Sequence, residues 1–260
     1  MPNLAANLST MFTEVEFMQR FAAAANAGFK AVEYLFPYDY AANDIAKALQ
    51  DHKLQQVLFN LPAGDWGSGE RGNACIPGRE DEFRQGVDKA ISYAQALQCT
   101  RINCLAGRVP ADSSDEQIKE TYVANVRYAA EQLQAADICL LIEMINTVDV
   151  PGYYLTTTAQ ALDILAEIDH PNVKLQYDIY HMQIMEGDLA RTIKNNLQVI
   201  QHMQLADNPG RHEPGTGEIN YHFLFNWLDE IGYKGWVGCE YIPKTTTEAG
   251  LAWLQSHNQI

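Results

Sequence analysis

The sequence of 260 residues is poor in cysteine, in basic residues and in long hydrophobic segments. Its five cysteines are odd in number and show no Cys-x-x-Cys spacing, which argues against a disulfide framework and against a zinc site. Lysine and arginine total 18 against 33 acidic residues, and the formal net charge of -15 would repel nucleic acid and anionic membranes. No apolar run approaches the length of a membrane span, and residues 1–7 lack the charged and apolar regions of a signal peptide. We therefore predict a cytoplasmic protein whose partner is a small molecule, with no nucleic-acid partner and no membrane partner.

The sequence also lacks internal repeats, low-complexity tracts, linkers and a Gly-x-Gly-x-x-Gly motif after its first strand-like segment. Strand-like segments instead alternate with helix-like segments along the whole chain, and 47% hydrophobic residues suffice for a large core. Eight such pairs predict an α/β fold, a (β/α)8 TIM barrel forming a single domain over residues 1–260. The expected strands are residues 4–8, 31–36, 55–60, 101–105, 139–146, 173–180, 199–206 and 236–241. The expected helices are residues 14–27, 43–52, 80–97, 114–134, 157–168, 187–196, 221–231 and 246–255.

Two polar, glycine-containing loops interrupt this alternation, at residues 61–78 and 208–220. The first is unusually long and carries Trp66, Glu70 and Arg71 among its glycines. A connection of that length is commonly a lid or a binding loop. Both loops are therefore expected to lie over a functional site.

The last four expected strands each end in an oxygen-bearing side chain. These side chains are Glu143, Asp178, Gln204 and Glu240. A lone carboxylate at a strand end commonly caps a helix or lies at a solvated rim, but four neighbouring strands with the same feature indicate a shared site at the carboxyl end of the barrel. His202 lies two residues before Gln204, so it is expected on the same face of its strand, one layer deeper.

The chemistry of these four side chains predicts a divalent metal and proton transfer. Three carboxylates and an amide suit a hard or borderline cation such as Mg²⁺, Mn²⁺ or Co²⁺, because clustered carboxylates are costly unless a cation offsets their charge. One glutamate would remove a proton next to a carbonyl and the other would return a proton to the neighbouring carbon, which is aldose–ketose isomerisation or epimerisation. Glu143 and Glu240 are the expected acid–base pair, and Asp178 and Gln204 are expected to be mainly ligands.

Further polar residues are placed to contact a substrate above the strand ends. They are His181, Arg211, Arg71, Arg108 and Glu213. His181 would hydrogen-bond a substrate oxygen or a ligand, with a locally satisfied loop histidine as the alternative. Arg211 would clamp a carboxylate or hydroxyl group, with a surface arginine as the alternative. Glu213 and Glu218 in the same loop would hold either that arginine or the groups that surround the site. Arg71 and Arg108 would bind an anionic group of the substrate.

Several segments of the chain resemble the hydroxypyruvate isomerase family of the xylose isomerase-like TIM barrels. The resemblance rests on Ala6-Asn7-Leu8-Ser9, Val32-Glu33, Leu35-Phe36-Pro37-Tyr38-Asp39-Tyr40, Asn60-Leu61-Pro62-Ala63-Gly64-Asp65-Trp66, Gly69-Glu70-Arg71-Gly72, Pro77-Gly78-Arg79-Glu80, Ile102-Asn103-Cys104-Leu105, Leu141-Ile142-Glu143, Gln176-Tyr177-Asp178-Ile179-Tyr180-His181-Met182-Gln183, the loop around Arg211, and Gly235-Trp236-Val237-Gly238-Cys239-Glu240-Tyr241. It implies interconversion of hydroxypyruvate and 2-hydroxy-3-oxopropanoate, a 2-oxo acid chemistry. The two active-site glutamates of the family fall on Glu143 and Glu240.

Two positions depart from that resemblance. Met144 stands where the family usually has proline after the glutamate. Gln204 stands where more distant sugar epimerases of the superfamily place a metal-binding histidine. An amide is a weaker ligand than an imidazole, so the expected metal affinity is lower here.

Other functions remain open at this level. A sister group that isomerises 2-oxo-tetronate shares much of the pattern, including His212-Glu213-Pro214. A metal-dependent DNA-repair endonuclease would use the same barrel but needs several strand-end histidines and a basic groove. A non-catalytic binding protein would not exchange protons of a bound 2-oxo acid. The sequence is compatible with a homo-oligomer and does not define the number of subunits.

Overall fold

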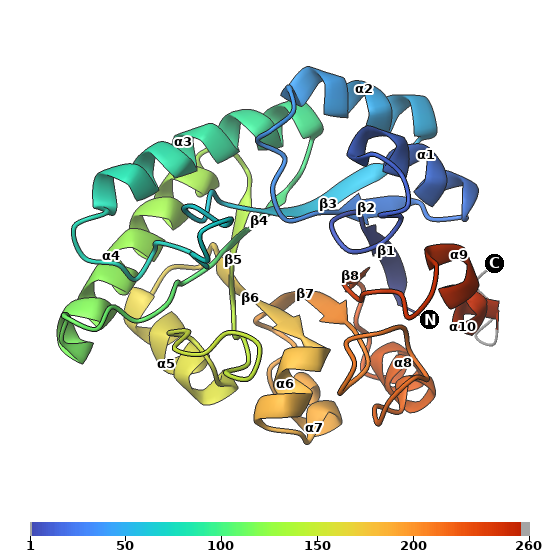
Figure 1. Ribbon diagram of the computed structural model, residues 1–260. Coiled ribbons are helices and arrows are strands. Elements are labelled where there is room, and N and C mark those ends of the chain that lie inside the picture. Colours follow the sequence, from blue (N-terminus) through green and yellow to red (C-terminus); the bar gives the residue numbers. More distant parts are fainter. Residues whose placement is uncertain (1, 256–260) are drawn as a thin grey trace.

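The computed structural model describes residues 2–255 and shows a closed barrel of parallel strands surrounded by helices (Figure 1). Neighbouring strands follow one another in chain order, and the last strand pairs with the first. The strands are β1 (Asn3–Asn7), β2 (Ala31–Glu33), β3 (Gln55–Asn60), β4 (Arg101–Cys104), β5 (Cys139–Glu143), β6 (Val173–Asp178), β7 (Ile200–Leu205) and β8 (Trp236–Cys239). The predicted (β/α)8 fold is confirmed.

The helices form the outer ring and bury their apolar faces against the strands (Figure 1). They are α1 (Phe17–Asn26), α2 (Ala42–His52), α3 (Glu80–Leu97), α4 (Asp115–Gln134), α5 (Thr158–Ile168), α6 (Ile179–Met185), α7 (Leu189–Asn195), α8 (Tyr221–Glu230), α9 (Thr247–Gly250) and α10 (Ala252–Gln255). Local sequence sets their ends: Ser114 and Gln117 form a reciprocal capping box at the start of α4. Among these helices, none combines the length and the apolarity needed to cross a bilayer.

The barrel interior changes from apolar to polar along the strand direction. A small interior cluster consists of Ala5, Ala31, Val57, Leu58 and Leu141. Side chains alternate along a strand, so the next inward positions on these strands are two residues further on. Two residues beyond Ala5, Ala31, Leu58 and Leu141 lie the polar groups Asn7, Glu33, Asn60 and Glu143, all buried, whereas Val57 is followed two residues on by the apolar Phe59. The strands thus present a polar layer at their carboxyl ends.

Several predicted boundaries differ from the observed ones because the chain leaves the sheet early. The strand predicted over residues 31–36 ends at Glu33, and the Leu35 amide instead bonds to Ser9 Oγ. The strand predicted over residues 139–146 ends at Glu143, and the strand predicted over residues 173–180 ends at Asp178. Asp178 immediately caps α6, so His181 lies in a helix. The helix predicted over residues 246–255 is divided into α9 and α10.

Candidate active site

A cavity of about 270 Å³ opens at the carboxyl ends of the strands. Every strand end or the loop that follows it contributes to its wall, which is the usual arrangement for a catalytic site in this fold. The wall consists of Thr10, Leu35, Asn60, Trp66, Arg71, Leu105, Glu143, Ile145, Asp149, Val150, Gln176, His181, Arg211, Glu240 and Ile242.

Glu143 and Glu240 both line this cavity and are almost fully buried, at 5% and 6% exposure. Glu143 ends β5, and its Oε2 accepts a hydrogen bond of 2.7 Å from Asn103 Nδ2 on β4. Glu240 directly follows β8, and its Oε2 lies 2.6 Å from Arg211 Nη2. The two glutamates therefore share one small enclosed space, but only Glu240 has a cation against it.

This difference separates the proton affinities of the two carboxyl groups. Burial, followed by the charges of Glu240 and Asp178, raises the pKa of Glu143 well above its ordinary value. Burial also raises the pKa of Glu240, to about 7, while the Arg211 guanidinium opposes the rise. Because the arginine lies against Glu240 and not against Glu143, Glu143 holds a proton more tightly than Glu240 does. Two carboxyl groups with separated pKa values are suited to acid and base roles.

Asp178 and His181 lie beside Glu143. Asp178 Oδ1 accepts from the backbone amides of Tyr180 and His181 at 2.7 and 3.3 Å, so one carboxylate oxygen caps α6. Its Oδ2 lies 3.6 Å from His181 Nε2. Burial raises the pKa of Asp178, and Arg211 opposes the rise. One ligand atom from each of Glu143, Asp178 and His181 lies within 4.8 Å of the others, so this cluster could hold a metal ion.

Gln204 is buried beside Asp178 in the strand register, and it is absent from the cavity lining. Its Oε1 accepts a hydrogen bond of 2.6 Å from Gln176 Nε2, and its Nε2 donates to Glu33 Oε1 at 2.7 Å. The amide oxygen expected to bind metal is therefore already used by a neighbouring amide. The two carboxylates Glu143 and Asp178 fit a hard cation, whereas one lone pair of the Gln204 oxygen is engaged by Gln176.

Glu33 is a central polar residue that the sequence reasoning did not single out. Its Oε2 lies 2.7 Å from His202 Nε2, and its Oε1 accepts from Gln204 and from Asn7 Nδ2 at 3.0 Å. Asn7 Nδ2 also lies 3.2 Å from Glu240 Oε1, which connects this buried network to the cavity. Glu33 was missed because the strand was expected to extend over residues 31–36, whereas β2 ends at Glu33. A strand predicted to end at residue 33 would have placed Glu33 among the other strand-end acids.

Of the three arginines predicted to contact the substrate, two line the cavity and one does not. Arg211 reaches the cavity, where its guanidinium also lies 5.1 Å above the Tyr180 ring. Arg71 reaches it too, stacked 4.1 Å from the centre of the Trp66 ring and donating to two backbone carbonyls of its own loop. Arg108 is exposed and lines a neighbouring cavity with Arg71, and it is not among the residues that line this one.

Glu213 does not contact Arg211 in the way the sequence suggested. Its Oε2 accepts from the Lys244 backbone amide at 2.9 Å, so it joins its loop to the segment that follows β8. Glu240 and Asp149 occupy the position beside the Arg211 guanidinium instead, at 2.6 and 3.6 Å.

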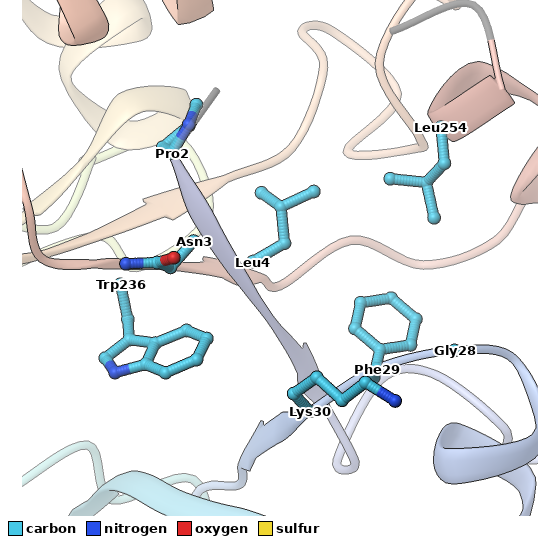
Figure 2. Close-up of a pocket in the computed structure, with 8 residues that line it drawn as sticks. All are labelled: Pro2, Asn3, Leu4, Gly28, Phe29, Lys30, Trp236 and Leu254. Atoms are coloured by element: carbon cyan, nitrogen blue, oxygen red, sulfur yellow. The ribbon is translucent and has the colours of Figure 1, made fainter. Parts of the chain in front are cut away.

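A second cavity of about 230 Å³ lies at the opposite end of the barrel. Figure 2 shows its lining, which includes Asn3 and Leu4 at the start of β1, Trp236 at the start of β8, and Phe29 and Lys30. Its lining contains no carboxylate. This cavity therefore does not provide the acid–base chemistry found at the carboxyl ends.

A TIM barrel with buried carboxyl groups of separated pKa around a small cavity is the architecture of an enzyme that moves protons on a small substrate. The chain belongs to the xylose isomerase-like TIM barrel family, whose sequence profile matches residues 21–257. It is 55% identical over 257 residues to the hydroxypyruvate isomerase of Escherichia coli K12, covering 99% of this chain and 100% of that protein. It is 47% identical to the 2-oxo-tetronate isomerase of Cupriavidus necator H16, covering 99% of both chains. Like these relatives, the protein is an isomerase.

Solved structures show the same fold. A crystal structure described as AP endonuclease, family 2 from Brucella melitensis superimposes with a TM-score of 0.96 at 49% identity, covering 99% of each chain. The similarity therefore extends through nearly all of the barrel and its loops.

Proposed function

We propose that the protein interconverts hydroxypyruvate and 2-hydroxy-3-oxopropanoate by proton transfer between Glu143 and Glu240. The observation that carries this proposal is the placement of both glutamates on the wall of one small buried cavity, with Arg211 beside only one of them. The 55% identity to a hydroxypyruvate isomerase supports the choice of substrate. The arginines on the wall suit the carboxylate of a 2-oxo acid.

The separated pKa values assign roles to the two glutamates. Glu240, ionised beside Arg211, removes the proton from C3 of hydroxypyruvate, and an enediolate forms. Glu143, which holds its proton more tightly, delivers a proton to C2. The hydroxyl proton moves from O3 to O2, and the product is 2-hydroxy-3-oxopropanoate. In the reverse direction the roles exchange: Glu143 removes the proton from C2, and Glu240 returns a proton to C3.

A divalent cation fits this site through oxygen ligands. We propose Mg²⁺ or Mn²⁺, held mainly by Asp178, with Glu143 joining as a ligand only in its ionised form, after it has delivered its proton. When bound, the cation would stabilise negative charge on the enediolate oxygens. Asp178 also orients the start of α6, and therefore His181, whether or not a cation is present.

The main alternative is a 2-oxo-tetronate isomerase, which the 47% identity to the Cupriavidus enzyme favours. An endonuclease is not supported by the site. The net charge of -15 on this chain opposes DNA binding, and among residues 2–255 the cavity wall contains a single histidine, His181.

A direct assay tests the proposed function. The purified protein is offered hydroxypyruvate and 2-oxo-tetronate side by side in heavy water, with and without a chelator. We expect faster turnover of hydroxypyruvate, with deuterium entering the substrate and product carbons. Faster turnover of 2-oxo-tetronate would establish the alternative. No deuterium uptake into either compound would refute an isomerase acting on these acids, and loss of activity with the chelator would show that the cation is required.

Replacing Arg211 by alanine should weaken substrate binding more than it slows turnover. We expect KM for the 2-oxo acid to rise on the order of 10- to 100-fold, the effect of losing one charge-assisted hydrogen bond. Because Arg211 opposes the rise in the pKa of Glu240, its loss should move that pKa above about 7. A base works when it is ionised, so the acidic limb of kcat/KM should shift to higher pH. The measurement is steady-state kinetics across pH.

The control for this prediction is Arg191→Ala, an exposed arginine of α7 paired with Asp188. Its kinetics should match the unmodified protein. An unchanged KM in Arg211→Ala would remove this arginine from the substrate contacts, and an unchanged acidic limb would mean that it does not govern Glu240.

A further inference from the structure

We propose that Asn146 is a positioning residue that holds His181 in the neutral form protonated at Nε2, so that this ring donates a hydrogen bond to a substrate oxygen. The inference rests on the proposed isomerase chemistry for its consequence, although the state of the ring can be tested separately. Asn146 follows β5 by three residues and is completely buried. His181 is also buried, and it lines the cavity with both glutamates.

The orientation of the Asn146 amide is defined by its own turn. Its Oδ1 accepts hydrogen bonds from the backbone amides of Val148 and Asp149, at 3.0 and 2.7 Å. Only an oxygen can accept from these two N–H groups, so the nitrogen must occupy the other position. That nitrogen lies 3.1 Å from Asp149 Oδ2, an acceptor, which agrees with the assignment.

The amide orientation then defines the protonation of the histidine. Asn146 Nδ2 lies 2.6 Å from His181 Nδ1, and an amide NH₂ group can only donate. His181 Nδ1 must therefore accept with its lone pair, and the ring proton of the neutral imidazole is on Nε2. Burial and the nearby Arg211 lower the pKa of His181 well below its ordinary value, in agreement with a neutral ring.

The Nε2 proton of His181 lies near the Asp178 carboxylate but does not form a hydrogen bond with it. The separation of 3.6 Å between His181 Nε2 and Asp178 Oδ2 is too long for a hydrogen bond. The ring can therefore donate into the cavity, where negative charge develops on the substrate oxygens during enediolate formation. A fixed neutral donor stabilises that charge without needing to reorganise.

The same assignment changes the expected metal ligands. A protonated Nε2 has no lone pair for a cation, so His181 would not ligate through that nitrogen. Of the three residues that could hold an ion, Glu143 and Asp178 would then supply the protein ligands. His181 acts on the substrate while Asn146 acts through His181.

Nitrogen NMR of the protein labelled in its histidines tests the tautomer without relying on activity. We expect His181, assigned by its loss in His181→Gln, to show an unprotonated Nδ1 and a protonated Nε2, before and after addition of Mg²⁺. A protonated Nδ1 with an unprotonated Nε2 in the unmodified protein would overturn the inference.

The variant Asn146→Asp tests the part played by the amide. Its carboxylate can still accept from Val148 and Asp149 but cannot donate to the ring, so His181 should become protonated at Nδ1. We expect kcat to fall on the order of 100-fold with a much smaller change in KM. Asn220→Asp, the same change at the exposed cap of α8, should alter neither the His181 signals nor kcat.

The outcomes separate this inference from the proposed function. If Asn146→Asp keeps both the original tautomer and normal turnover, Asn146 does not position His181 and the inference fails. If the tautomer changes as expected but the unmodified protein exchanges no protons of either 2-oxo acid, the proposed function fails and the structural assignment of the ring stands.

Discussion

Replacing Glu143 by glutamine is expected to lower kcat at least ~100-fold, the usual scale for losing a general acid or base, while the barrel remains folded. Glutamine keeps the shape of the side chain and an oxygen that can accept from Asn103 Nδ2. It cannot exchange a proton with the substrate. Replacing Glu240 by glutamine should have an effect of the same size. That variant lacks the base that removes the proton from C3, just as Glu143→Gln lacks the acid that delivers a proton to C2.

The measurement is kcat with hydroxypyruvate, together with circular dichroism to confirm folding. Glu120→Gln, at an exposed position of α4, is the matched control and should retain full activity. Single-turnover exchange in heavy water adds a sharper test. Glu240→Gln should abolish exchange at C3, whereas Glu143→Gln should still allow some exchange there, because the ionised Glu240 remains. Near-normal turnover in either variant would refute the assignment of that residue.

Replacing Gly238 by alanine is expected to lower the free energy of unfolding by about 2–4 kcal/mol, through steric overlap and disturbed buried hydrogen bonds. A Cβ at this position would lie 2.1 Å from Glu33 Oε1. That carboxylate is held by His202, Gln204 and Asn7, so it cannot turn away without leaving buried donors unpaired. The glycine in β8 thus makes room for the acidic group at the centre of the barrel.

Chemical denaturation followed by fluorescence measures this effect. The control is Gly67→Ala, because a Cβ there meets only Asp65 Oδ1 at 3.4 Å and the position is exposed. We expect the control to stay within about 0.5 kcal/mol of the unmodified protein. Equal stabilities for the two variants would show that Glu33 is free to move and that the buried network is not rigid. A loss of activity in Gly238→Ala is also expected, since Asn7 connects Glu33 to Glu240.

The sequence by itself predicted the barrel and the two glutamates that we propose as its acid and base. Alternation of strand-like and helix-like segments is a local property of the chain, and eight such units have few ways to close. Residues 55–60 and 80–97 were predicted with the observed bounds because glycine, proline or polar residues mark their ends. The acids at 143 and 240 were found because each follows a short apolar run.

Which polar groups contact one another depends on the closed barrel. Gln204 was expected at the cavity, but Gln176 from β6 and Glu33 from β2 use both ends of its amide. Arg108 was expected near the substrate, but it is exposed and lines a separate cavity. The physical reason is that hydrogen-bond partners across a closed barrel come from strands far apart in the chain. A side chain with two possible partners binds the one that the geometry of the whole barrel places within reach. The sequence determined which oxygen-bearing side chains lie at the strand ends, and the closed barrel determined which of these side chains remain available to a substrate.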